Sequence, residues 1–303
     1  MLFAPYCTGN GGVSIVSPSG KTSHIVAHER CDALRPNGIA LEPGGSFLLA
    51  HLGEEKGAVV RLFADGQTEL VTDEIDGHAM PPANFVTRDQ DGRIWITVST
   101  RMTPRASDYR RSASTGFIAR HEGGRTSIKA DALGYANEIA FSADQKTVCI
   151  NETFARRTSA FDVNEVGDLS DKRTVATYGA GTFPDGVAYD ANGDLWITSI
   201  ISNRVIHISG KSAVTIIEDC EADHIAWVEA AFESDSLGRP HLDKAFSKKL
   251  CNISSLAFGG IDLKTAFLGS LLDNKIASFQ SPVAGQPLPH WDVELGPLVE
   301  YLE

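Results

Sequence analysis

A pattern that recurs through the chain constrains its fold more than any other feature. Each copy has a small or polar residue, a short apolar run, a turn rich in Asp, Asn or Gly, and a second apolar run. The copies are PNGIALEPGGSFLLA (36–50), ANFVTRDQDGRIWIT (83–97), ANEIAFSADQKTVCI (136–150), FPDGVAYDANGDLWITS (183–199) and, more loosely, SSLAFGGIDLKTAFLG (254–269). Repeats of about 40–50 residues built from short strands are typical of β-propeller blades. We therefore expect an all-β protein.

Each copy is followed by strand-like runs that complete a larger unit. These runs alternate apolar and polar residues and mostly end in a turn signal. They are GAVVRLFADG (57–66), GFIARHEGG (116–124), RTSAFDVNEVG (157–167), NRVIHISGKS (203–212) and NKIASFQS (274–281). Four antiparallel strands make one propeller blade. With the strand-like N-terminus, the repeats predict a six-bladed β-propeller with four antiparallel strands per blade, formed by residues 1–303 as a single domain.

The two ends of the chain are expected to share one blade. LFAPY (2–6), GGVSIVSPSG (11–20) and TSHIVAHE (22–29) resemble its second, third and fourth strands. The tail 290–303 contains the strand-like pieces WDVEL and LVEYL. The blade is then either closed by the tail or left without its inner strand. We predict closure by the N- and C-terminal segments, because it removes an exposed sheet edge.

One segment breaks the strand pattern, and the bulk composition limits the partners. Residues 221–249 lie in the longest interval between copies and predict an inserted, partly helical loop. The formal charge of −12 argues against nucleic-acid and anionic-membrane partners. The five cysteines are scattered and form no C-x-x-C pair, and the N-terminus lacks a basic region typical of signal peptides. We expect a cytoplasmic protein that binds a small molecule.

A polar residue stands just before the inner strand of each repeat. These marker residues are Asn37, Asn84, Asn137, Asp185 and Ser254. Inner strands line the channel of a propeller, so the markers are expected to converge at one mouth. Any one of them alone is more often a turn residue, but the turns of these repeats lie elsewhere. Asp185 is the only charged marker, and its carboxylate and the amide oxygens suit Ca²⁺, Mg²⁺ or Mn²⁺.

The stretches RPNGIALEPGGSFLLA, ANEIAFSADQKTVCINETFARR and FPDGVAYDANGDLWITSIISNRVI resemble the senescence marker protein/gluconolactonase (regucalcin-like) family of six-bladed β-propellers. The resemblance covers most of the chain. It implies a lactone or ester hydrolase with one divalent cation in the channel, Ca²⁺ first and Mg²⁺, Mn²⁺ or Zn²⁺ as alternatives. It implies Asn137 and Asp185 as metal ligands, and Asn84 as a channel residue that contacts substrate or metal.

The chain departs from the family pattern at three positions. The family's first-blade glutamate would precede Met1, and Glu294 in VELGPL is the tail residue with a similar setting, so we take it as a candidate ligand. Pro82 stands where the family often has an arginine, and Glu138 where it has a glycine. These departures imply a substrate pocket unlike that of the sugar-lactone members, and a cation site without its usual second carboxylate.

We therefore expect a metal-dependent hydrolase that opens a sugar lactone or a related small cyclic ester. The cation would polarise the carbonyl and activate water. Asp185 is expected to act first as a ligand and second as a base, with nucleophile as a further alternative. The loop 100–116 carries four arginines, and Arg101 is the predicted substrate-binding one because it is nearest the strand end. A solvated basic loop is the alternative.

Two other functions stay open. The chain could be a non-catalytic propeller that binds a small molecule or a protein, or a hydrolase of organophosphate esters, because propellers host many functions. The missing glutamate favours the non-catalytic alternative, and the retained Asn137 and Asp185 favour the hydrolase. His51 and His224 are expected to be structural histidines rather than channel bases. Trp95 and Trp196 are expected to pack between blades.

Overall fold

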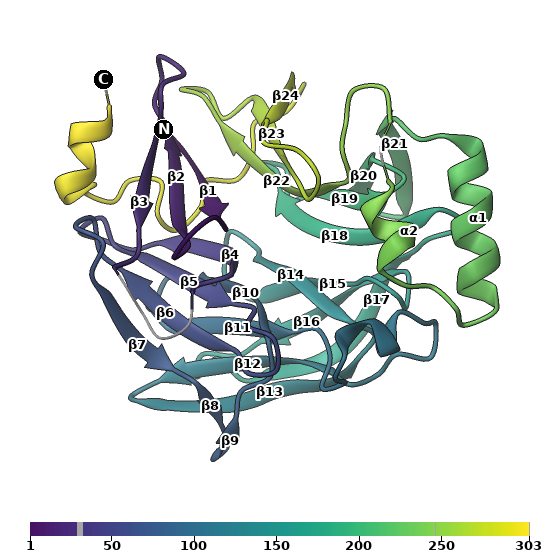
Figure 1. Cartoon of the computed structure of the whole chain (residues 1–303), viewed down its shortest axis with the longest axis horizontal. Coiled ribbons are helices and arrows are strands. Elements are labelled where there is room, and N and C mark those ends of the chain that lie inside the picture. Colours follow the sequence, from purple (N-terminus) through teal and green to yellow (C-terminus); the bar gives the residue numbers. More distant parts are fainter. Residues whose placement is uncertain (29–32, 246, 303) are drawn as a thin grey trace. The chain divides into compact units, whose positions relative to one another are not determined.

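The computed structural model describes residues 1–28, 33–245 and 247–302. Within them, six antiparallel sheets follow one another along the chain (Figure 1). Consecutive strands are neighbours in every sheet, so each sheet is built from local hairpins. This confirms the predicted six-bladed β-propeller. Four sheets have four strands, and the first and last have three in the described part of the chain.

The strands of the six sheets have the following bounds. The first three sheets comprise β1 (Leu2–Tyr6), β2 (Gly12–Val16) and β3 (Thr22–Val26); β4 (Pro36–Leu41), β5 (Phe47–His51), β6 (Ala58–Leu62) and β7 (Thr68–Thr72); and β10 (Ala83–Arg88), β11 (Ile94–Val98), β12 (Gly116–Glu122) and β13 (Arg125–Leu133). The last three comprise β14 (Ala136–Phe141), β15 (Thr147–Glu152), β16 (Arg157–Val163) and β17 (Leu169–Thr177); β18 (Thr182–Tyr189), β19 (Leu195–Ile201), β20 (Arg204–Ser209) and β21 (Ser212–Glu218); and β22 (Ile253–Gly259), β23 (Thr265–Ser270) and β24 (Ala277–Gln280). A small hairpin joins β8 (Glu74–Ile75) to β9 (His78–Ala79).

The chain divides into two compact units, which are described separately below. Unit 1 comprises Met1–Val98, Ile118–Lys129 and Leu288–Glu303, and unit 2 comprises Ser99–Phe117 and Ala130–Pro287. In each unit one second strand of a sheet, β11 (IWITV) in unit 1 and β19 (LWITSII) in unit 2, is buried along its whole length. The outer strand β21 is largely exposed. Strands covered on both faces read as continuous apolar runs, which explains the second run of each repeat.

The C-terminal tail in unit 1 does not form the predicted strand. The piece WDVEL has no strand, and Gly296–Tyr301 forms the 3-10 helix η2. Gly296 has a φ of 52°, which breaks an extended backbone, and Pro297 has no N–H to donate to a sheet. Leu298 is fully buried in the cluster that contains Phe47. The tail is therefore attached by side-chain packing, and the predicted closure by a C-terminal strand is wrong.

The segment 221–249 in unit 2 carries two helices, α1 (Ala222–Glu233) and α2 (Arg239–Asp243). Their buried residues join an aromatic cluster that includes Phe183 of β18. Arg156 lies between the rings of Phe183 and Phe232, 4.3 and 4.1 Å from their centroids, and pairs with Glu229 of α1. This cluster attaches the insertion to the sheet. None of the described helices has the length and apolarity needed to cross a bilayer.

Candidate functional site

The pairing of every marker's inner strand with its neighbour is interrupted at the marker. The register shifts fall between Pro36 and Ile39, Ala83 and Phe85, Ala136 and Ile139, Pro184 and Val187, and Ile253 and Ser255. Such bulges bend a strand and redirect its side chains, often beside functional sites. Each marker residue therefore lies at a β-bulge. This explains why the marker residues lie outside the turns of the repeats.

The bulge at Asp185 in β18 is held by side chains of unit 2. Asn151 Nδ2 donates to the carbonyl oxygens of Asp185 and Gly186, at 3.1 and 2.9 Å. The Gly186 N–H donates to Thr198 Oγ1 at 2.9 Å. A Cβ atom on Gly186 would lie 2.7 Å from the carbonyl oxygen of Ser254, so a larger residue does not fit there. The backbone of Asp185 is thus fixed before any ligand binds.

A second bulge, in β14, brings another carboxylate to the same place. Asn137 and Glu138 together oppose one residue of β15. Asn137 Nδ2 donates to Thr153 Oγ1 at 3.1 Å. Glu138 Oε2 accepts the N–H of Val187 at 3.3 Å, directly after the Asp185 bulge. Two carboxylates and one amide therefore come from neighbouring bulges of β14 and β18.

The surroundings of these carboxylates are poorly solvated. Asp185 is 8% exposed, and burial raises its pKa to about 8 although the charge of Arg105 opposes the shift. Burial and the negative charge of Asp185 raise the pKa of Glu138 well above its ordinary value. Glu138 keeps a partly accessible surface, whereas Asp185 is buried. Two adjacent carboxylates and an amide oxygen form a hard donor set that fits a divalent cation.

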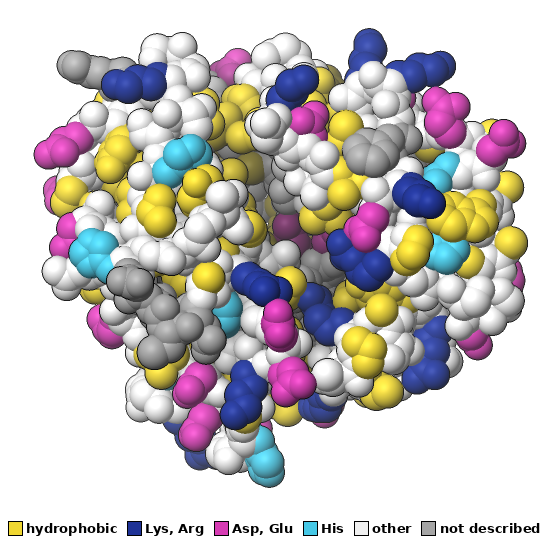
Figure 2. All heavy atoms as spheres, viewed as in Figure 1, with side chains coloured by type: hydrophobic (Ala, Val, Ile, Leu, Met, Phe, Trp, Pro, Cys, Tyr) yellow, Lys and Arg dark blue, Asp and Glu magenta, His cyan; other side chains and the backbone are white. Residues whose placement is uncertain are grey.

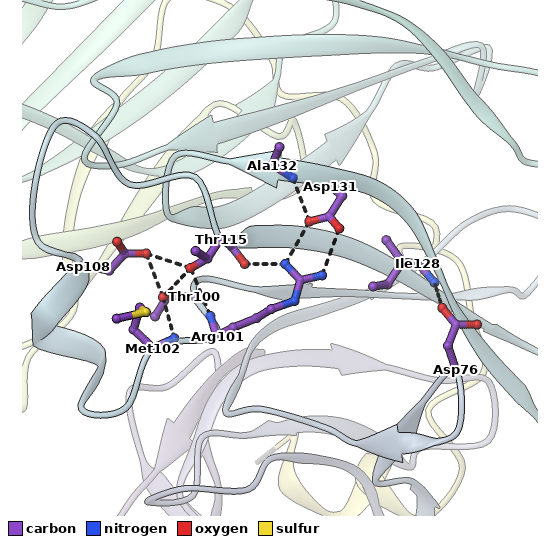
Figure 3. A network of polar contacts seen from close by, with 9 residues as sticks. All are labelled: Asp76, Thr100, Arg101, Met102, Asp108, Thr115, Ile128, Asp131 and Ala132. Carbon is purple, nitrogen blue, oxygen red and sulfur yellow. Dashed lines mark hydrogen bonds and ion pairs between the residues drawn. The ribbon is translucent and has the colours of Figure 1, made fainter.

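Two arginines of the loop 100–116 differ in the hydrogen bonds and ion pairs that they form. Arg101 binds Asp131 in a bidentate pair at 2.8 and 3.0 Å and donates to the Thr115 carbonyl oxygen at 2.7 Å (Figure 3). Arg105 donates from Nη2 to Ser99 Oγ at 3.1 Å, and its Nε has no hydrogen-bond partner within the described residues. The charge of Arg105 acts on Asp185. Arg105 rather than Arg101 is therefore the arginine whose charge acts on Asp185.

Aromatic side chains surround the arginine and anchor its loop. The guanidinium of Arg105 lies 5.7 Å from the ring centroid of Tyr135. Tyr135 packs edge-on against Tyr109 and Phe154, at 5.5 and 4.7 Å between centroids. Buried Asp108 accepts the hydroxyls of Thr100 and Thr115 at 2.7 and 2.8 Å, as Figure 3 shows. The loop is thus a fixed wall of the site.

Two predicted residues, Asn84 and Glu294, belong to unit 1. Asn37 Nδ2 donates to both the backbone oxygen and Oδ1 of Asn84, at 2.8 and 2.6 Å. Glu294 has an exposed side chain, and its backbone oxygen accepts the N–H of Gly44 at 3.1 Å. Glu294 therefore lies beside the residues that follow β4, whereas the marker Asn37 stands at the start of that strand. The roles of Asn84 and Glu294 stay predictions.

A further cluster of ligand-type side chains lies elsewhere in unit 2. Asp190 and Asp194 of the turn between β18 and β19 and His207 of β20 offer ligand atoms that lie within 4.8 Å of one another. Asp190 accepts the indole N–H of Trp196 at 3.0 Å and the N–H groups of Asn192 and Asp194 at 2.9 and 3.0 Å. Its carboxylate is therefore already used to hold the turn.

The same arrangement recurs in unit 1. Asp89 accepts the indole N–H of Trp95 at 2.8 Å and the N–H of Arg93 at 2.9 Å. Trp95 and Trp196 are 0 and 1% exposed, which confirms that they are core residues. His51 accepts the N–H of Arg35 at 3.0 Å, a structural role as expected. His224 lies on α1 beside Trp227.

The charged side chains of the outer surface are mixed. Figure 2 shows Lys and Arg interspersed with Asp and Glu on the face drawn there. Many of them form exposed pairs such as Arg173 with Asp162 at 2.5 Å. Exposed pairs of this kind contribute little to stability.

Comparison with known proteins identifies relatives of the chain. Residues 16–226 match the family model described as the SMP-30/Gluconolactonase/LRE-like region. Two Arabidopsis thaliana proteins, Strictosidine synthase-like 4 and 7, are each 28% identical over 171 and 169 residues, covering 55 and 54% of this chain. The matches span 44 and 43% of those proteins, so the chain matches less than half the length of these relatives.

Solved structures share the fold. A gluconolactonase from Xanthomonas campestris superposes with a TM-score of 0.61 and 22% identity, covering 86% of this chain and 75% of that chain. Virginiamycin B lyase from Staphylococcus aureus superposes with a TM-score of 0.54 and 14% identity, covering 97 and 85%. These identities are low, and the two names describe different reactions. The likeness therefore establishes the propeller fold and leaves the reaction to the site.

Proposed function

Because the chain belongs to the SMP-30/gluconolactonase/LRE-like family, we propose that it is a metal-dependent hydrolase that opens a lactone or a related small cyclic ester. The observation that carries the proposal is the set of hard oxygen donors on neighbouring bulges. Asp185 and Asn137 would hold the cation, with Ca²⁺ as the first choice. When bound, a divalent cation polarises a carbonyl and makes a bound water more acidic.

The remaining residues of the site would bind and orient the substrate. Arg105 has an unpartnered Nε and a charge that acts on Asp185, which suits it to a developing oxyanion or to the carboxylate of the product acid. Tyr135, Tyr109 and Phe154 form an apolar wall that would contact the carbon skeleton and exclude water. Rigid support from Asn151 keeps Asp185 in position between turnovers.

A lactone panel tests this function. Purified protein is offered five- and six-membered sugar lactones and simple alkyl lactones, and acid release is followed with a pH indicator. We expect hydrolysis that stops with a chelator and returns with added Ca²⁺, Mg²⁺ or Mn²⁺. Heat-denatured protein with the same cations corrects for spontaneous ring opening. If no lactone is opened, or if chelation changes nothing, the non-catalytic alternative replaces this function.

Substitution of Arg105 is expected to weaken turnover. Arg105→Ala removes a charged donor beside the reacting group, and a hydrogen bond to a charged group is worth about 1.5–3 kcal/mol, so kcat/KM should fall about 10- to 100-fold. Arg105→Lys keeps the charge but loses the planar fork, and should recover only part of the rate. Arg101→Ala should lower the rate less, because Arg101 is engaged by Asp131. A larger loss for Arg101→Ala would restore Arg101 as the substrate-binding residue.

A further inference from the structure

We propose that Glu138 is the second carboxylate ligand of the cation site, beside Asp185 and Asn137. This inference rests on the proposed metal-dependent function and extends it to a residue outside the predicted ligand set. It places the second carboxylate ligand on the inner strand β14 instead of on the C-terminal tail, where Glu294 is exposed.

Comparison of the bulges within the chain supports this assignment. The residue after the marker is Gly38 in β4 and Gly186 in β18. A Cβ atom on either would lie 2.7 Å from backbone atoms of the next inner strand, at Phe85 and Ser254 respectively. This position therefore faces the neighbouring inner strand at close range. In β14 the same position is occupied by Glu138.

The direction of Glu138 follows from its one backbone contact. Its Oε2 lies 3.3 Å from the Val187 nitrogen, across from β14 to β18. Val187 directly follows the pair Asp185–Gly186, which bulges out of β18. The carboxylate of Glu138 consequently reaches the bulge that bears Asp185, and both carboxylates border the same space.

A purely structural role does not account for a carboxylate here. A single backbone hydrogen bond of 3.3 Å compensates little of the cost of removing a charge from water. Within residues 1–28, 33–245 and 247–302, no arginine or lysine pairs with Glu138. The other buried glutamate of this sheet, Glu152, is by contrast held by Arg157 and Lys172. Among these residues Glu138 therefore has no positively charged partner, which a divalent cation would supply.

Direct metal binding tests the assignment without an activity assay. Chelator-treated protein is titrated with Ca²⁺ alone in a calorimeter, and the increase of the melting temperature at saturating Ca²⁺ is recorded in parallel. Glu138→Gln keeps the size and the acceptor oxygen but removes the charge. We expect it to weaken Ca²⁺ binding at least about 10-fold, the scale seen when groups around a metal are lost. Glu138→Asp, with a shorter carboxylate, should bind with intermediate affinity.

The controls separate this inference from the function on which it rests. Asp144→Asn alters an exposed carboxylate in the turn of the same sheet and should bind Ca²⁺ as the unaltered protein does. If the unaltered protein binds Ca²⁺ and Glu138→Gln binds it equally well, Glu138 is not a ligand and the proposed function survives. If Glu294→Gln loses binding instead, the tail carries the second carboxylate. If the unaltered protein binds neither Ca²⁺ nor Mg²⁺ or Mn²⁺, both proposals are overturned.

Discussion

Asp185→Asn should lower lactone hydrolysis by about two to three orders of magnitude, the range found when one preorganised electrostatic group is removed from an active site. The expected loss is large because Asp185 is the charged marker and its backbone is already fixed by Asn151 and Thr198. The measurement is kcat/KM on the best lactone of the panel, at saturating cation.

The stability of the same variant distinguishes a functional from a structural carboxylate. Burial opposes the charged form of Asp185 and raises its pKa to about 8, and a charged Asp185 repels a charged Glu138. Above about pH 8 the neutral amide should therefore raise the melting temperature of the metal-free protein, by roughly 2–4 °C for each kcal/mol relieved. Asp144→Asn, an exposed change, should alter neither rate nor melting temperature. A variant that keeps its activity but melts earlier would make Asp185 a structural residue.

Glu152→Ala should cost about 3–5 kcal/mol of unfolding free energy, the range for removing one partner of a buried ion pair. The Glu152 side chain is fully buried and accepts from Arg157 at 2.5 and 2.8 Å, from Ser159 Oγ at 2.5 Å and from the Gly134 N–H at 2.7 Å. Lys172 lies 3.0 Å away. Urea unfolding at neutral pH measures the cost. Asp162→Ala breaks an exposed pair with Arg173 and should cost at most about 1 kcal/mol.

The same residue gives the protein a specific sensitivity to acid. Burial alone would raise the pKa of Glu152, but its bonds to Arg157, Ser159 and Gly134 and the charge of Lys172 lower it from 4.5 to about 2. A lowered pKa contributes stability above the ordinary value, and that stability is lost as the pH falls from about 4.5 to about 2. At neutral pH this lowered pKa of Glu152 contributes about 3 kcal/mol to the free energy of unfolding. In Glu152→Gln the free energy of unfolding should depend less on pH between about 4.5 and about 2. An unchanged pH dependence would contradict the role of Glu152 in the acid sensitivity.

The repeated blade could be predicted because its signals are local. Turn residues and apolar runs recur along the chain, and each hairpin pairs neighbouring segments, so five sheets follow directly from the copies. The tail was predicted wrongly because WDVEL and LVEYL have the composition of strands. Gly296 and Pro297 interrupt them, and Leu298 gains more from burial beside Phe47 than from pairing. Whether such a segment pairs as a strand or packs through its side chains depends on residues that are distant in the sequence.

The site was predicted only in part for the same reason. The marker pattern predicts Asn137 and Asp185 as ligands, which stays a prediction, and the bulge that each of them occupies is a property of paired strands. Comparison of the residues after the markers of β4, β14 and β18 (Gly38, Glu138 and Gly186) is the sequence signal for the proposed ligand Glu138. The sequence favours Arg101 over Arg105 because Arg101 is nearer the strand end. It does not show that Arg101 is paired with Asp131, because Asp131 lies 30 residues further along the chain.

The sequence by itself determined the repeat, the all-β class and the position of the marker residues, because these depend on residues close together in the chain. Only the tertiary structure decided which carboxylates and arginine meet. Glu138 and Asp185 lie 47 positions apart, and their proximity arises from the close approach of two inner strands at Val187. Burial then raises the pKa of both acids, and the proposed cation would favour their charged forms.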